Sequence, residues 1–281
     1  MQDAFAYCAE LVRAADRDRF IASLFAPAGR RNALHALYAF DIEIARVREV
    51  AHAALPGEIR LQWWSDVLRG ERAGEAAANP VAAALIETVR RYELSVETLA
   101  AAVEAHGFDL YEEPMATVDE LKSYVAKTCA APLSLAVQIL GGGDGAGDVI
   151  QPAGLIIAIA RLLRTFPQHV ARRQLFVPVE TLSRHGIAAE SVFAGENTPG
   201  LRAALGELRD LAAESLIAAS RHIAAVPSAA LPALLPVAVA RLVLDRMKAL
   251  DYDPFAPPEI QPWRRQWVIW RAARNAKRIT G

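Results

Sequence analysis

Residues 29–49 read GRRNALHALYAFDIEIARVRE, and this stretch decides the fold class. It is rich in alanine, leucine, arginine and glutamate, which favour helix, and no proline interrupts it. The pattern therefore predicts one long helix over about 29–53. Because the same stretch carries several acids, it is either a metal-binding carboxylate cluster or the polar face of a helix, and the choice bears directly on whether the chain is an enzyme.

Helical composition continues along the rest of the chain, and clusters of proline and glycine mark the breaks. No segment has the pattern of a strand, since QLFVP at 174–178 is short and ends in proline. The glycine-rich segment at 141–148 is expected to be a flexible connector. The prediction is an all-α fold in a single domain, 1–281. The predicted helices span 3–15, 29–53, 57–70, 80–91, 95–109, 118–140, 147–171, 200–224, 228–250 and 263–276.

Composition excludes several function classes. The 281 residues are 53% hydrophobic with a net charge of −1, which suits a sizeable core and argues against a nucleic-acid partner. The two cysteines, Cys8 and Cys129, form no metal-binding pattern and are expected to be small buried residues in a reducing compartment. The N-terminal residues lack the pattern of an export signal, and no apolar stretch reaches the roughly 20 residues of a spanning helix. We therefore expect a cytoplasmic protein, or one peripheral at the inner membrane face.

Five segments, in order and with their spacing, resemble the squalene/phytoene synthase family, whose enzymes join two prenyl diphosphates head to head. The resemblance covers about residues 15–256. The segments are GRRNALHALYAF (29–40), NPVAAAL (79–85), ELKSYVAKTCAAPLSLAVQILGG (120–142), ARRQLFVPVETLSRHGI (171–187) and YDPF (252–255).

The resemblance implies an isoprenoid synthase-type helical bundle around a central cavity. In active members, two aspartate-rich helices face each other across its mouth and hold magnesium ions that bind the substrate diphosphates. Magnesium requires several nearby oxygen ligands, and it neutralises the leaving diphosphate.

The first family motif, D-D-x-x-D, falls on residues 45–49 of this chain. Ala45 and Arg46 replace two of its three acids, and only Glu49 is left. Asp41 shares a predicted helix face with Glu49, but the two would lie about 12 Å apart at 1.5 Å rise per residue, too far for one ion. Asp41 and Glu49 are therefore weak metal candidates that are expected to line the cavity.

The second family motif, D-x-x-x-D with a further acid, falls on residues 165–169. All its acids are gone, Thr165 and His169 take the cavity-facing i, i+4 places, and Pro167 is expected to kink the helix. His169 is interpreted as a hydrogen-bonded packing residue rather than a ligand. No metal is expected at either motif, and Mg²⁺ would be a cofactor only if the chain were an active synthase.

Arginines gather near these motifs, and two interpretations stay open. They bind an anionic head group directly, or they pair with surface acids such as Glu43, Glu49 and Glu58. The acids of 109–113 are interpreted mainly as a solvated helix end. No catalytic residue is expected. The cavity or ligand candidates are Tyr38, Asp41, Ala45, Arg46, Glu49, Asp109, Arg164, Thr165, Gln168, His169, Arg172 and Arg173.

Two tryptophan-rich stretches refine the hypothesis. PGEIRLQWWSDVLRG at 56–70 resembles an aspartate-poor branch of the family that includes the mitochondrial complex I assembly factor, and one of its two tryptophans is expected to pack inside. The basic stretch 261–278 carries Trp263, Trp267 and Trp270 on one helical stripe and has no acid. The stripe is expected to dock on the bundle; contact with an anionic membrane is the alternative.

The leading hypothesis is a family member that has lost metal-dependent prenyl transfer and acts as a binding or assembly factor, with a protein partner in respiratory complex biogenesis. One alternative is an active prenyltransferase condensing farnesyl or geranylgeranyl diphosphate. The other is an isoprenoid or lipid binding protein that keeps an open cavity. A bundle interior filled by side chains would count against both alternatives.

Overall fold

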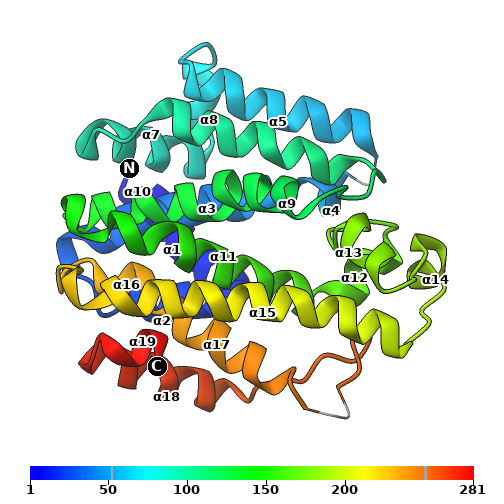
Figure 1. Cartoon of the computed structure of the whole chain (residues 1–281). Coiled ribbons are helices and arrows are strands. Elements are labelled where there is room, and N and C mark those ends of the chain that lie inside the picture. The colour runs from blue at the N-terminus through cyan, green and yellow to red at the C-terminus, as the bar shows by residue number, and fades with distance from the viewer. Residues whose placement is uncertain (52, 250–251) are drawn as a thin grey trace.

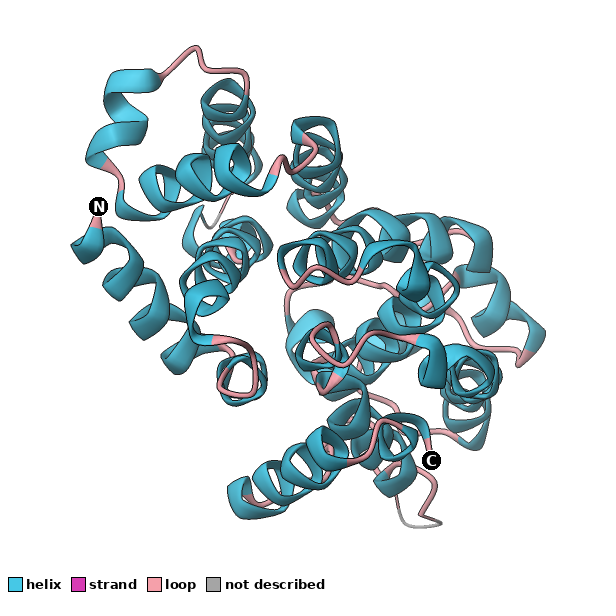
Figure 2. Cartoon of the chain, turned by 90° about the vertical axis from the view of Figure 1, so that its left-hand side faces the viewer, coloured by secondary structure: helices cyan, strands magenta, loops and turns pink. Residues whose placement is uncertain are grey.

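The computed structural model describes residues 1–51, 53–249 and 252–281, and within these ranges it contains helices and no strands. Figure 2, turned by 90° from Figure 1, views many of the helices close to end-on and shows no strand. The predicted all-α class is therefore confirmed. No described helix combines the length and apolar content needed to cross a bilayer.

The first half of the chain builds a layer in which α1, α3 and α7 pack against one another, while α5 packs on α8. The elements are α1 (Gln2–Ala15), α2 (Arg17–Ser23), α3 (Ala28–Ala45), α4 (Val47–Ala51), α5 (Ala54–Leu68), α6 (Ala73–Ala78), α7 (Pro80–Tyr92), α8 (Val96–Ala105) and the 3₁₀ turn η1 (His106–Leu110).

The second half is centred on α11, which packs against α15, α17 and the π-helical turn η2. Its helices are α9 (Val118–Val125), α10 (Ala131–Ile139), α11 (Gly147–Arg164), α12 (Phe166–Ala171), α13 (Val179–Arg184), α14 (Ala189–Phe193), α15 (Pro199–His222), α16 (Leu231–Leu234), α17 (Pro236–Arg246), α18 (Pro262–Arg274) and α19 (Lys277–Thr280). The short turns are η2 (Ala126–Ala130), η3 (Gly143–Ala146) and η4 (Ile223–Ala225).

The helix predicted over 29–53 is interrupted. Helix α3 ends at Ala45, and Arg46 leaves helical geometry with φ −97° and ψ 5° before α4 begins at Val47. The prediction of a single helix was therefore wrong, and the regular helical spacing that it assumed between Asp41 and Glu49 does not hold. Within that prediction, residue 52 lies outside the described residues, as does residue 250 at the end of the helix predicted over 228–250.

The predicted helix 147–171 is also broken, at the position where proline was expected to disturb it. Helix α11 ends at Arg164, Thr165 has φ −95° and ψ 10°, and Pro167 lies in the first turn of α12. Proline is tolerated in a first turn because its missing N–H has no helical partner there. The prediction of a kink is confirmed, and the second motif region begins at a helix break.

The core runs through both halves. From Ala33 to Ile42 every residue of α3 is buried, and Trp64 of α5 is fully buried against Phe40 with ring centroids 5.0 Å apart. Its neighbour Trp63 is only partly buried, so the prediction that one of the two packs inside is confirmed. The glycine-rich segment 141–148 is not an open connector, since a Cβ on Gly142 would lie 2.4 Å from the Val137 side chain and part of the segment forms η3.

Candidate functional site

A central cavity of about 620 Å³ lies between the two halves of the bundle. Its wall combines residues of α3, η1, α9, η2, α11 and α17, together with the α1–α2 junction and the start of α18. The size is typical of small-molecule sites. Of the twelve sequence candidates, nine line it: Tyr38, Asp41, Ala45, Arg46, Glu49, Asp109, Arg164, Thr165 and His169. The other three, Gln168, Arg172 and Arg173, are not among its lining residues.

The positions of the two family motifs do face the cavity, but their remaining acid is already engaged. Glu49 accepts from Arg46 Nε at 3.3 Å and from Arg172 Nη1 at 3.0 Å. The second contact links α4 to the turn after α12, across the gap between the two motifs. Arg173 lies near Glu112 at 3.7 Å, so three arginines near the motifs, Arg46, Arg172 and Arg173, pair with surface acids.

Asp41 belongs to a partly buried ion-pair chain, centred on Arg19, that the sequence did not reveal. Arg19 Nη1 donates to Asp41 Oδ2 at 2.6 Å, and Arg19 Nε donates to Asp16 at 2.7 Å. Burial opposes the charge of Arg19, but the two carboxylates outweigh it and raise the pKa of the guanidinium above its usual value. The same guanidinium stacks over the Tyr38 ring at 4.8 Å, and burial raises the pKa of the Tyr38 phenol.

Asp109 is buried, so the prediction of a solvated helix end is wrong for this residue and holds only for the exposed Glu112 and Glu113. Its carboxylate accepts from His106 Nδ1 at 2.7 Å and from the Tyr124 hydroxyl at 2.8 Å. Burial, and then the charge of Asp109, raise the pKa of Tyr124 well above its usual value. The turn η1 folds these groups inward, away from water.

His169 packs as expected, with its ring 4.7 Å from that of Phe176 and its Nε2 3.3 Å from the Thr165 hydroxyl. Burial lowers its pKa to about 4, so the ring is neutral near pH 7. Cys129 also lines the cavity, and burial raises the pKa of its thiol. Neither residue joins a cluster of ligands.

Arg161 was missed by the sequence reasoning. It lies four residues before Thr165 on α11 and lines the cavity, half-buried, without an ion pair or side-chain hydrogen bond to any described residue. Its spacing from Thr165 could have indicated it, because positions i and i+4 share a helix face and Thr165 was already a cavity candidate. His106 was missed for a similar reason, since its i, i+3 spacing to Asp109 was not considered.

The residues present do not fit the magnesium cluster that the fold implies. All five carboxylates that line the cavity already have a cationic or hydrogen-bonding protein partner, and the described residues contain no group of three or more His, Cys, Asp or Glu side chains able to hold a metal ion. A cluster of hard cations needs several free oxygen ligands. The partnered carboxylates are Asp16, Asp18, Asp41, Glu49 and Asp109.

Helix α18 docks on the bundle, but not by its tryptophans. Ile269 and Ala272 are buried, and Arg265 pairs with Asp18 of α2, with 2.9 Å from Nε to Oδ1. The expected docking of the tryptophan stripe is therefore wrong. The side chains on the outer face are large and exposed: Trp263 at 62%, Trp267 at 51% and Trp270 at 37%.

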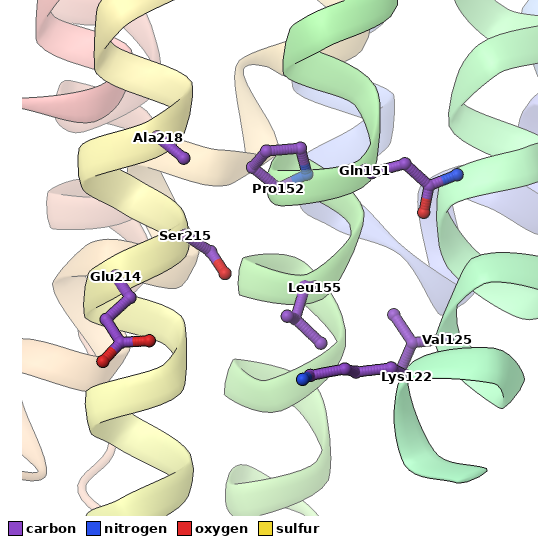
Figure 3. Close-up of a pocket in the computed structure, with 8 residues that line it drawn as sticks. All are labelled: Lys122, Val125, Gln151, Pro152, Leu155, Glu214, Ser215 and Ala218. Atoms are coloured by element: carbon purple, nitrogen blue, oxygen red, sulfur yellow. The ribbon is translucent and has the colours of Figure 1, made fainter. Parts of the chain in front are cut away.

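A second, shallower pocket of about 370 Å³ opens on the surface between α9, α11 and α15 (Figure 3). In Figure 3 Lys122 reaches across it beside Leu155, while Glu214 and Ser215 come from α15. Its lining residues include one lysine and one glutamate but no histidine, cysteine or aspartate, so nothing in this pocket indicates a catalytic or metal site.

Comparison with known proteins connects this geometry to a family. A squalene/phytoene synthase family model matches residues 12–271. A relative in Rattus norvegicus named NADH dehydrogenase (ubiquinone) complex I, assembly factor 6, is 27% identical over 278 residues, covering 94% of this chain and 84% of that protein. The phytoene synthase of Thermus thermophilus is 25% identical, covering 93% of this chain and 90% of that protein.

Solved structures show the same fold. The squalene synthase HpnC from Alicyclobacillus acidocaldarius superimposes with a TM-score of 0.77 at 22% identity, covering 90% of this chain and 96% of that one. A dehydrosqualene synthase in complex with a ligand reaches a TM-score of 0.83 at 15% identity, covering 98% and 96%. The expected isoprenoid synthase-type bundle is confirmed.

Proposed function

Because the chain belongs to the squalene/phytoene synthase family, we propose that it is a member without metal-dependent prenyl transfer that serves in the assembly of a respiratory NADH dehydrogenase complex. The observation that carries the first half is the state of the cavity carboxylates, all of which are already partnered within the protein. The second half is supported by the assembly-factor relatives, which cover most of the chain.

The competing enzymatic function would need a different ligand set. An active synthase must neutralise a leaving diphosphate, and the groups at the two motifs here are Ala45, Arg46, Thr165 and His169. Rebuilding a metal site would require breaking the Glu49 contacts with Arg46 and Arg172.

Two measurements test the two halves separately. The pure chain, incubated with farnesyl or geranylgeranyl diphosphate and with magnesium or manganese, with and without NADPH, should release no pyrophosphate above a boiled control. Removing the gene from the cells that carry it should lower the amount of assembled NADH dehydrogenase complex on a native gel, and re-expression should restore it. Turnover would overturn the first half, and an unchanged complex would overturn the second.

Binding of an isoprenoid or lipid is a second candidate function, favoured by the open cavity. The interior is not filled by side chains, so the condition that would have weakened a ligand-based function is not met. Lipid binding and a role in assembly are compatible. A ligand in the cavity stabilises the folded chain, and the folded chain is the form that takes part in assembly.

Helix α18 supports peripheral contact with an anionic membrane surface as part of this function, at the inner face of the membrane. Its exposed tryptophan stripe is flanked by cations, and residues 260–281 contain no acid, which suits a negatively charged bilayer. The rings of Trp267 and Trp270 stack 5.0 Å apart, and Arg274 lies 3.8 Å from the centre of the Trp270 ring. The flanking cations are Arg264, Arg271, Arg274, Lys277 and Arg278.

Sedimentation with vesicles tests the membrane contact. The chain should pellet with anionic vesicles more than with neutral ones, and less as salt rises. The double variant Trp267→Ala/Trp270→Ala should lose most of this binding, whereas Ile217→Ala, which changes a more exposed apolar residue on α15, should not. Equal pelleting with both vesicle types, or an unaffected double variant, would contradict it.

A further inference from the structure

The charges that line the cavity are unevenly satisfied. Every lining carboxylate has a partner, and Arg19, Arg46 and Arg265 are the cations that pair with them. Three other lining arginines form no ion pair with the described residues, and of these Arg17 and Arg164 are solvent-exposed. Arg161 alone among the three is half-buried in the wall, so the described part of the cavity holds one interior guanidinium without a counter-charge.

The position of Arg161 explains why a protein acid does not satisfy it. Asp41 favours its charge through space, but that carboxylate is held by Arg19. Burial raises the pKa of Tyr124 and Cys129 and lowers that of His169, and the charge of Arg161 acts on all three, opposing the two rises and adding to the fall. All three side chains line the same cavity as Arg161. A guanidinium presents several N–H groups in a fixed plane that matches phosphate or carboxylate oxygens.

A second polar group in the same wall also lacks a partner. His106 is only 2% exposed, and its Nδ1 donates to the Asp109 carboxylate, so in the neutral ring Nε2 carries a free lone pair. That atom is buried and accepts no hydrogen bond from the described residues. An unsatisfied buried acceptor costs free energy, so it is suited to a ligand that carries an O–H group.

Another part of the wall is apolar. Leu133 of α10, Ile157 of α11, Val239 and Val243 of α17 and Ile260 before α18 line the same space. This surface offers no hydrogen bonds and suits a hydrocarbon chain. The cavity therefore has a cationic part and an apolar part, which is the division found in an anionic amphiphile.

We propose that Arg161 binds the phosphate head group of a single-chain amphiphile inside the cavity, directly and without a divalent cation, while the hydrocarbon chain lies against the apolar wall. The partly protonated oxygen of a phosphate monoester can donate to His106 Nε2. This site rests on the ligand-binding part of the proposed function, and it differs from metal-bridged diphosphate binding in its residues and its charge.

Titration calorimetry in the presence of EDTA tests the site. The probes are farnesyl monophosphate, farnesol, which has the same chain without the anion, and inorganic phosphate, which has the anion without the chain. Farnesyl monophosphate should bind at least about tenfold more tightly than either of the others, because it alone combines charge-assisted hydrogen bonds to its head group with burial of its hydrocarbon chain. Arg161→Gln should reduce its affinity to that of farnesol, and Arg161→Lys should retain part of the gain.

Arg173→Gln is the matched control, since Arg173 carries the same charge but lies outside the cavity and pairs with Glu112. It should leave the affinity unchanged. Equal binding of farnesol and farnesyl monophosphate, unchanged binding in Arg161→Gln, or binding that requires magnesium would overturn the site. If inorganic phosphate binds as tightly as farnesyl monophosphate, the hydrocarbon chain adds nothing and the ligand is not an amphiphile. Because these are binding measurements on the wild-type chain as well as its variants, their failure leaves the assembly experiment unaffected.

Discussion

His35 is a buried titratable residue that the cavity does not use. Its Nε2 lies 2.8 Å from the Ser23 hydroxyl, whose proton goes to the Phe20 carbonyl, so Nε2 carries the hydrogen and Nδ1 is left without a partner. Burial, and then Arg31, lower the pKa of His35 from 6.5 to about 4. The folded chain therefore keeps this ring neutral at a pH where the unfolded chain protonates it.

This difference predicts a loss of stability in mild acid. As pH falls below 6.5 the unfolded state binds a proton that the folded state does not, so the free energy of unfolding drops until pH reaches about 4. The contribution is of the order of 3 kcal/mol over that window. The His35 ring stacks on Phe20 with centroids 5.5 Å apart, and a phenylalanine at this position keeps an aromatic ring there. Urea unfolding of the wild type and of His35→Phe should show the two stabilities converging or crossing as pH falls. Parallel pH profiles would contradict the assignment.

Residue roles depended on contacts that the sequence could not show. The loss of the motif acids at Ala45, Arg46, Thr165 and His169 could be predicted from the sequence, because it depends only on residue type and spacing. The burial of Asp109 was not, because it results from the 3₁₀ turn η1 and from Tyr124, fifteen residues further along. The same holds for Arg19 and Asp41, which meet through the packing of α2 on α3.

At the scale of elements, α11 approaches η2 unusually closely. Gly154 faces Ala130, and a Cβ on Gly154 would lie 2.7 Å from the Cα and Cβ of Ala130. The obstacle is partly backbone, so no side-chain rotation relieves it. This contact holds together the two elements that carry Arg161 and Cys129.

Gly154→Ala should therefore lower the free energy of unfolding by about 1–3 kcal/mol, the usual cost of overpacking, despite the better helix propensity of alanine. Gly147→Ala is the control on the same helix, because nothing lies within 4 Å of its added Cβ. It should change stability by less than about 0.5 kcal/mol. Chemical denaturation of both variants gives the comparison, and equal stabilities would show that α11 can shift away from η2.

Apart from α3, whose end at Ala45 was missed, the long helices were predicted better than the short ones. The long helices α1, α7, α11 and α15 begin and end close to their predicted bounds or at a proline that the sequence displays. The short helices α2, α6, α13, α14 and α19 were missed. A helix of one or two turns is not stable by its own propensity and forms only through tertiary packing, so its sequence carries little signal.

At the scale of the whole molecule, an ion pair joins the first and last parts of the chain. Arg265 of α18 pairs with Asp18 of α2 in a two-point contact, 247 residues apart in sequence and mostly buried. Both residues line the cavity, so the pair closes the bundle at one side of the site. No sequence pattern indicated it, because a pairing at this separation depends on the complete fold.

A double-mutant cycle with Asp18→Asn and Arg265→Gln should give a coupling energy of about 1 kcal/mol or more, because the pair is sheltered and bidentate. The solvent-exposed pair of Glu10 and Arg13 on α1 serves as the control and should give less than about 0.5 kcal/mol. Thermal and urea unfolding of the four proteins in each cycle supply the numbers. A coupling energy no larger than that of the control would show that α18 is held by its apolar contacts alone.

The placement of the five tryptophans has an optical consequence. Trp64 is fully buried, Trp63 is partly buried, and Trp263, Trp267 and Trp270 are exposed. None of the described residues that line the cavity is a tryptophan. Intrinsic fluorescence should therefore be dominated by α18 and shift to shorter wavelength when that helix enters a lipid interface, while a ligand in the cavity leaves the emission colour nearly unchanged. The tryptophan emission therefore responds to the surface at α18 and not to the cavity. One emission spectrum distinguishes binding to a bilayer from binding of a single lipid molecule inside the bundle.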